Sequence, residues 1–248
     1  MNKINKIALI VITLSFIGLK SFSQSGETIV VNDFETWTKA GLKLKLDKNW
    51  SFGLEQQLRL DSNSTEVEAY FTEFNAQYKT ETGLVFGGGF RFIRDNDNEG
   101  KVQGYENHIR FNFDLGYKHS VKRLKLGYRV RFQTKNELGK SKDEGDYANN
   151  HLRLKVGGEY NIKKWKFDPK LSLELFHHME EGEENGLDKF RATIGTSYDL
   201  KKYGDLGLFY RLERELNPTY VDYPKTSYIV GLSYIYTIKL KKNETSKK

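Results

Sequence analysis

Polar and apolar residues alternate along almost the whole of this chain, and this alternation limits its possible folds more than any other feature. The segment 105–117 is an example. One parity carries Ile109, Phe111, Phe113, Leu115 and Tyr117, and the other carries Glu106, His108, Arg110, Asn112 and Asp114. A period of two places the two sets on opposite faces of a β-strand. Because no stretch after the first 23 residues keeps a helical period, the sequence predicts an all-β chain.

Eleven segments show this alternation. They are 36–46, 50–60, 68–79, 84–94, 105–117, 124–132, 152–160, 165–178, 188–198, 205–214 and 226–240. Strands of soluble proteins average about 5–6 residues, whereas a tilted strand that crosses a membrane needs about 9–11. The lengths of the segments therefore favour membrane-spanning strands.

Short and long connections alternate along the chain. A short connection follows the first strand of each pair, as at 47–49 and 80–82, and a longer polar one follows the second, as at 95–103 and 135–146. No linker separates the hairpins, so we expect one domain. Short turns at one end and longer loops at the other are typical of up-and-down antiparallel outer-membrane β-barrels, with the turns in the periplasm and the loops outside the cell.

Composition excludes several classes of protein. The chain has 248 residues, no cysteine and a mean hydropathy of −0.67. The absence of cysteine excludes a disulfide scaffold and a thiolate metal site. The low hydropathy argues against a bundle of membrane-spanning helices, and an aromatic content of 14% argues against a disordered chain.

The first residues have the features of a signal peptide. Lys3 and Lys6 precede an apolar stretch at 7–19, which is followed by Ser21 and Ser23 around a cleavage signal. We expect residues 1–23 to be cleaved, 24–240 to form the barrel and 241–248 to be a flexible basic tail. Since the removed segment holds three lysines and no acidic residue, the net charge falls from +7 to +4. We therefore expect no nucleic-acid partner.

The direction in which the apolar face points decides the interpretation. Alternation alone fits a soluble barrel with an apolar interior as well as a membrane barrel with an apolar exterior. Aromatic residues of the apolar parity, however, gather beside the short turns. They are Trp50, Tyr78, Tyr117, Tyr160, Trp165, Tyr198 and Tyr236. Rings with a polar tip favour the lipid headgroup region, so these residues predict a membrane aromatic girdle and an apolar exterior.

The number of strands follows from closure. An open sheet edge cannot face hydrocarbon, and bacterial barrels normally have an even number of strands. The short segment Glu27–Val31 is the only candidate to join the eleven others. We expect about twelve strands, with ten as the alternative.

The opening hairpin resembles a known family. Asp33-Phe34-Glu35-Thr36-Trp37, Gly41-Leu42-Lys43-Leu44, Trp50-Ser51-Phe52 and Glu55-Gln56-Gln57-Leu58-Arg59 look like the start of the domain of unknown function 2490. The resemblance extends more loosely over the remaining hairpins. It implies an outer-membrane β-barrel of a type common in the Bacteroidetes lineage, and it brings no catalytic residues with it.

The polar parity of a membrane barrel faces its lumen, and here that parity is rich in basic residues. The predicted lumen-lining residues are Lys43, Lys45, Glu55, Arg59, Arg91, His108, Arg110, Asp114, Lys125, Arg129, Arg131, His151, Arg153, Lys155, Glu159, Glu174, Arg191, Arg211 and Glu213. A water-filled lumen lined by more basic than acidic side chains would favour anions. The alternative is that opposite charges pair across the lumen and close it.

Sequence motifs for catalysis or metal binding are weak in this chain. An outer-membrane lipid hydrolase would need a serine beside a histidine, and no serine lies within two residues of His108 or His151. Asp95, Asp97, Glu99 and Glu106 are a weak calcium candidate, but Asp, Asn and Gly also form ordinary turns. We expect no catalytic residues, no bound metal and no cofactor.

The sequence thus predicts a passive, narrow, porin-like pore for small, anionic solutes, or a structural barrel of the cell envelope. An outer-membrane lipid-modifying enzyme and a loop-mediated binding protein are the alternatives. Expected partners are outer-membrane lipid and small anions. The sequence does not indicate whether the barrel is a monomer or a homo-oligomer.

Overall fold

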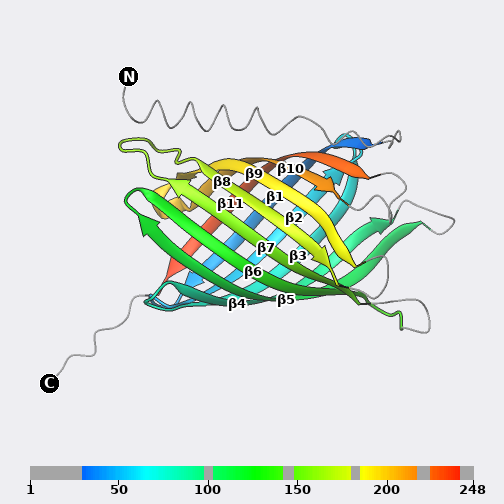
Figure 1. Cartoon of the computed structure of the whole chain (residues 1–248), viewed down its shortest axis with the longest axis horizontal. Helices are drawn as coiled ribbons and strands as arrows, with labels where there is room; N and C mark the ends of the chain where they lie inside the picture. The colour runs from blue at the N-terminus through cyan, green and yellow to red at the C-terminus, as the bar shows by residue number, and fades with distance from the viewer. Residues whose placement is uncertain (1–29, 98–102, 142–147, 180–184, 217–223, 241–248) are drawn as a thin grey trace.

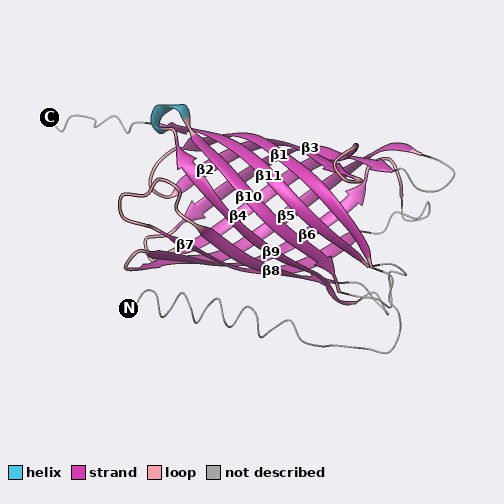
Figure 2. Cartoon of the chain, turned by 90° about the horizontal axis from the view of Figure 1, so that it is seen from above, coloured by secondary structure: helices cyan, strands magenta, loops and turns pink. Residues whose placement is uncertain are grey.

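The computed structural model describes residues 30–97, 103–141, 148–179, 185–216 and 224–240. These residues form eleven strands that close into one barrel (Figures 1 and 2). The strands are β1 (Val31–Lys45), β2 (Trp50–Asp61), β3 (Glu66–Lys79), β4 (Leu84–Asp97), β5 (Gly104–Val121), β6 (Leu124–Glu137), β7 (Asn149–Tyr160), β8 (Lys170–His178), β9 (Gly186–Asp199), β10 (Asp205–Glu215) and β11 (Lys225–Lys239). A 3-10 turn, η2 (Lys201–Tyr203), lies between β9 and β10. The all-β barrel fold predicted from the sequence is confirmed.

The described residues form eleven strands, which is close to the expected number of about twelve. Neighbours along the chain pair antiparallel, and β1 then pairs with β11 in parallel, from Val31↔Lys225 to Lys45↔Lys239. An odd number of alternating strands leaves the first and last running in the same direction, so closure requires one parallel pair. Because the edges pair directly, no additional strand is needed to satisfy their backbone groups.

Parallel closure places the two ends of the described chain at opposite ends of the barrel. Strand β1 starts at the end that carries the longer loops, and β11 finishes at the end that carries the short turns (Figure 1). The predicted signal peptide at 1–23, most of the candidate strand Glu27–Val31 and the tail at 241–248 lie outside the described residues. Val31 itself begins β1.

Several strand boundaries differ from the prediction, and two of these differences change a connection at the short-turn end. Strand β5 runs on to Val121, which shortens the turn before β6 to two residues. Strand β8 begins at Lys170, not at 165, because the preceding segment folds into a turn. In this turn Asp168 accepts a hydrogen bond from the backbone N–H of Ile162, and the indole N–H of Trp165 donates to the carbonyl of Phe167. Aromatic residues at 165 and 167 imitate a strand pattern there.

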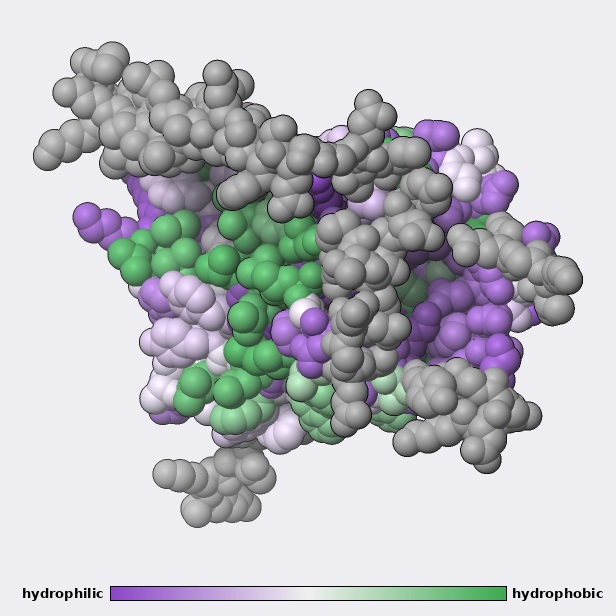
Figure 3. All heavy atoms as spheres, turned by 45° about the vertical axis from the view of Figure 1, so that its right-hand side comes forward, coloured by the Kyte–Doolittle hydropathy of each residue, from purple (hydrophilic) through white to green (hydrophobic). Residues whose placement is uncertain are grey.

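The two faces of the barrel wall differ sharply in polarity. Along β5, Phe113 is 68% exposed, whereas its neighbour Asn112 is 3% exposed and Arg110 is 9% exposed. Large exposed apolar residues alternate in the same way on most strands, as at Trp50, Phe52, Leu54 and Leu58 on β2. Figure 3 shows a hydrophobic patch over part of the visible wall. The apolar face therefore points outward and the polar face is enclosed, as in a transmembrane barrel.

Glycines on the enclosed face make room for larger side chains. Gly231 on β11 lies beneath the ring of Phe209 on β10, and a Cβ atom at position 231 would overlap this ring. No helix in the described part of the chain is long and apolar enough to cross a membrane.

Candidate functional site

The barrel encloses a polar cavity, called here the central cavity, to which all eleven strands contribute side chains. Its volume is about 490 Å³. Its twelve basic lining residues are Lys39, Arg59, Arg91, Arg110, Arg129, Arg131, Arg153, Lys155, Lys189, Arg191, Arg211 and Lys225. Its seven acidic lining residues are Glu35, Glu55, Glu68, Glu73, Glu174, Glu213 and Glu215. The lining therefore carries five more positive than negative charges.

Glu174 on β8 joins arginines from three other strands. Its carboxylate oxygens lie 2.6 Å from Arg129 on β6, 2.9 Å from Arg153 on β7 and 3.6 Å from Arg191 on β9. The side chain of Glu174 is only 2% exposed. Arg191 also binds Glu213 on β10, at 2.5 Å. A buried carboxylate needs such partners, and this cluster ties together five neighbouring strands of the wall.

Two further carboxylates neutralise arginines on strands β4 to β6. Glu73 on β3 binds Arg91 on β4, and it also binds Arg110 on β5 at 3.3 Å. Asp114 on β5 accepts two hydrogen bonds from the guanidinium of Arg131 on β6, at 2.6 and 2.7 Å. Two parallel bonds hold a planar guanidinium in one orientation. These pairs narrow the lumen from this side.

Besides Phe209, which packs over Gly231, three aromatic rings lie on the enclosed, otherwise polar face of the wall. Each ring has a guanidinium over its face: Arg59 at 3.7 Å from the centroid of Trp37, Arg91 at 3.6 Å from that of Phe71, and Arg153 at 4.2 Å from that of Phe176. Arginine stacks well on aromatic faces. The rings therefore support the arginines in the lumen without neutralising their charge.

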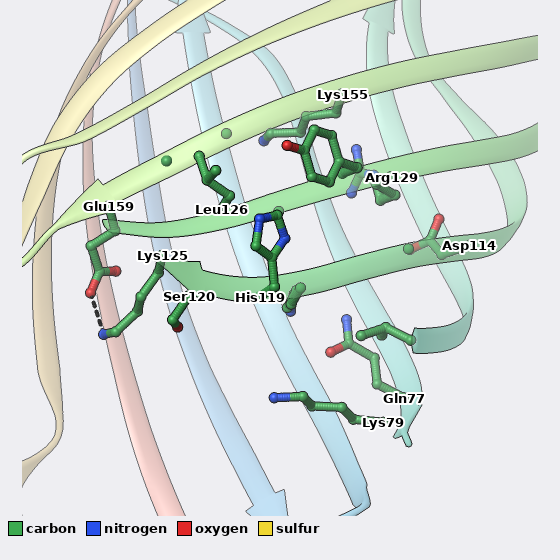
Figure 4. A pocket seen from close by; sticks show the side chains of 17 residues that line it. Gln77, Lys79, Asp114, His119, Ser120, Lys125, Leu126, Arg129, Lys155 and Glu159 are labelled. Carbon is green, nitrogen blue, oxygen red and sulfur yellow. Dashed lines mark hydrogen bonds and ion pairs between the residues drawn. The ribbon is translucent and has the colours of Figure 1, made fainter. Parts of the chain in front are cut away.

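Other cavities adjoin the central one. The cavity at the short-turn end has a volume of about 500 Å³ and shares Arg129 and Lys155 with it (Figure 4). In this cavity Lys125 forms an ion pair with Glu159 at 2.7 Å. Cavities of about 290 and 340 Å³ lie against the wall and also share lining residues with the central cavity. The enclosed space thus extends from the middle of the barrel to the short-turn end.

The structure brings most of the predicted lumen residues together. All of them except Lys45, His108 and His151 line one of these cavities. Lys45 is exposed at the short-turn end of β1. The two histidines lie toward the long-loop end, where each faces carboxylates.

His151 on β7 is bound on one side only. Its Nε2 atom lies 3.0 Å from Asp188, and its ring stacks on His178 of β8 with centroids 4.8 Å apart. Its Nδ1 atom has no hydrogen-bond partner among the described residues. A hydrolase would need a nucleophilic hydroxyl hydrogen-bonded to the histidine. Among the described residues, no hydroxyl forms such a bond with His151.

His108 on β5 lies in a group of charged residues at the same end. Its Nε2 atom is 3.7 Å from Asp95 and 3.5 Å from Glu106. Glu106 also faces Lys140, which lies in the loop beyond β6. Hydrogen bonding to Glu137 raises the pKa of Lys140. The charges at this rim are therefore paired locally.

The predicted calcium residues are distributed along this rim. Glu99 lies outside the described residues, and Asp97 ends β4. Asp95 forms an ion pair with Lys135 at 2.5 Å, and its register partner on β5 is Glu106. Within the described ranges, no three histidine, aspartate or glutamate side chains converge in a way that could hold a metal ion.

The predicted girdle residues all lie toward the short-turn end. Trp50 and Tyr78 are register partners with ring centroids 5.0 Å apart. Trp165 lies in the turn before β8, and Phe167 links it to Tyr198, with centroids 6.1 and 5.2 Å apart. The remaining members, Tyr117, Tyr160 and Tyr236, are about 40% exposed on the outer face.

Several lumen residues were not in the predicted set. They are Glu35, Trp37, Phe71, Phe176 and Lys225, which all line the central cavity except Phe71, a buried neighbour of Arg91. Parity could have found the members on β1, because Glu35 and Trp37 share the parity of the predicted Lys43. For the inward aromatic residues the residue type gave the opposite signal to parity, since aromatic residues are expected on the lipid face.

The fold and the sequence of this chain are similar to those of known proteins. Two solved structures are similar to the chain, each at 12% identity. The β domain of the Bordetella autotransporter BrkA has a TM-score of 0.44 and covers 66% of this chain and 76% of its own. The porin NanC has a TM-score of 0.49, and the match covers 82% of this chain and 98% of the NanC chain. No curated protein matches the sequence. The family described as a protein of unknown function (DUF2490) matches residues 34–223, from within β1 to the segment before β11.

Proposed function

The chain belongs to the DUF2490 family of proteins of unknown function, and from the lining of its lumen we propose that it is an outer-membrane pore that passes small anions passively. The observation that carries this proposal is the central cavity, where twelve basic residues face seven acidic ones. A ring of basic side chains in a narrow lumen attracts anions and repels cations.

The proposed location rests on the outer face of the barrel. Residues exposed on this face are apolar, and the aromatic girdle lies at the height expected for a boundary between hydrocarbon and headgroups. The proposal orients the short turns toward the periplasm and the longer loops toward the exterior of the cell. It also includes export through the signal peptide at 1–23.

The pore is narrow because ion pairs occupy much of the lumen. Arginines held by Glu174, Glu73 and Asp114 project into the lumen from β4 to β7 and β9. Selectivity then arises from the arginines and lysines that exceed the carboxylates. The proposal assigns no catalytic step to the barrel.

Planar-bilayer recording tests the proposal. The full chain, purified in detergent and inserted into a bilayer, is expected to conduct, and in a potassium chloride gradient its reversal potential is expected to shift toward that of chloride. A reversal potential toward potassium would contradict the assigned selectivity. Inserted protein without any conductance would overturn the pore and favour a structural barrel of the envelope.

A further inference from the structure

Lys155 on β7 and Arg211 on β10 are exceptional among the twelve basic residues of the central cavity. Each of the other ten has a carboxylate within ion-pair distance. Neither Lys155 nor Arg211 forms an ion pair with any carboxylate of the described residues. The guanidinium of Arg211 donates a hydrogen bond to the hydroxyl of Thr193 at 3.0 Å.

The nearest carboxylates are already occupied by other cations. Glu174 is the register partner of Lys155 on β8, but three arginines bind it. Glu213, two residues from Arg211 on the same strand, binds Lys189 at 3.0 Å and also binds Arg191. Enclosed charges are costly unless they are paired. A negative charge brought into the lumen would therefore find two uncompensated cations here.

Both cations border the same free space. They line the central cavity and also the cavity of about 340 Å³ in the wall beside it, which we call the wall recess. The lining of the wall recess includes Gly157, Ser172 and Thr193, small residues that are successive register partners from β7 to β9. Thr193 is in turn the register partner of Arg211. The lining also includes Glu159 and Lys170, which form an ion pair with each other at 3.5 Å. Small side chains leave room beside the two cations, and their hydroxyls supply neutral polar contacts.

We propose that the wall recess is a binding site for the oxyanion group, carboxylate or phosphate, of a small solute held between Lys155 and Arg211. The inference rests on the proposed function, because the solute must reach the lumen. A guanidinium and an ammonium together offer a planar pair of donors and a point charge, which suits the several acceptor oxygens of such a group. The volume of the recess is within the range of small-molecule sites.

Trp37 provides a reporter for this site. Its ring centroid lies 4.8 Å from the guanidinium carbon of Arg211, whereas the other tryptophans, Trp50 and Trp165, lie on the outer face. In a chain with both outer tryptophans replaced by phenylalanine, the fluorescence of Trp37 is recorded in detergent while sodium phosphate or sodium malonate replaces sodium chloride at constant ionic strength. We expect a saturable change in emission with at least one of the two anions.

Substitutions of the two cations test whether the change in Trp37 emission comes from an anion bound in the wall recess. Lys155→Gln and Arg211→Gln are each expected to weaken binding about thirtyfold or more, the effect of removing one partner of an enclosed charge pair. Lys45→Gln, at an exposed lysine that lines none of the four cavities, is the matched control and should leave the affinity unchanged. Near-ultraviolet circular dichroism checks that each variant is folded. The two substitutions remove charges that lack a carboxylate partner, so folding should be retained.

The outcomes separate this site from the pore. A saturable response to phosphate alone, to malonate alone or to both supports an oxyanion site and indicates its preference. A response that never saturates, or one that persists in both lumen variants, overturns the site. Since binding is measured in detergent, a barrel that binds but does not conduct refutes only the pore. A barrel that conducts but does not bind refutes only the site.

Discussion

Replacing Glu174 with glutamine keeps the size of this side chain and removes its charge. The carboxylate is 2% exposed and binds Arg129, Arg153 and Arg191 from three different strands. Removing one partner of a buried ion pair typically costs about 3–5 kcal/mol, because the remaining charge is left uncompensated. Three arginines lose a partner here, although Arg191 keeps Glu213. We therefore expect a loss of about 3–5 kcal/mol in the free energy of unfolding.

Equilibrium unfolding by urea in detergent micelles or thin bilayers measures this loss. Glu159→Gln is the matched control, because its partners Lys125 and Lys170 are 60% and 42% exposed, and exposed pairs of this kind contribute about 0–1 kcal/mol each. Equal stability of the Glu174 and Glu159 variants would refute the view that the lumen cluster joins the strands. The Glu174 variant also gains one net positive charge in the lumen, so its reversal potential should move further toward chloride.

Two other predictions concern closure and packing. The chain has no cysteine, so Leu42→Cys with Tyr236→Cys, register partners on the outer faces of β1 and β11, should form a disulfide on mild oxidation. A further strand between β1 and β11 would separate them by about 10 Å and prevent it. Gly231→Ala should cost about 1–3 kcal/mol of unfolding free energy, since its Cβ would overlap the ring of Phe209. Gly127→Ala, which meets only an ordinary contact, should cost less, and an equal loss would argue against the packing of the ring.

Local alternation was sufficient to predict all eleven strands and the parity of their faces. It works because a strand exposes successive side chains to opposite sides, so that the pattern of Phe113 and Asp114 depends on no distant contact. The same reasoning gave a wrong prediction in the turn before β8. Trp165 and Phe167 alternate as in a strand, but Asp168 binds backbone groups of the turn, and local periodicity carries no information about such a hydrogen bond.

Closure and pairing depend on the whole barrel and could not be predicted from segments. The expectation of an even strand number came from the frequency of such barrels, whereas the physical requirement is only that both edges are paired. Side-chain contacts in the lumen also could not be predicted from separate segments. Arg129 reaches Glu174 across the intervening strand β7, and Trp37 points inward among arginines although an aromatic ring is expected to face lipid. The sequence predicts a basic lumen, but not which cations lack a carboxylate.

The central claim is that the apolar face of the wall meets lipid while the polar face encloses the lumen. Single cysteines at each position from 109 to 115 on β5, each carrying a nitroxide spin label in the reconstituted barrel, test it directly. The account predicts that labels at odd positions, such as Phe113→Cys, are accessible to oxygen dissolved in the bilayer and shielded from a water-soluble nickel chelate. Labels at even positions, such as Asn112→Cys, should be far less accessible to oxygen. The opposite phase, or accessibility without a period of two, would contradict the account.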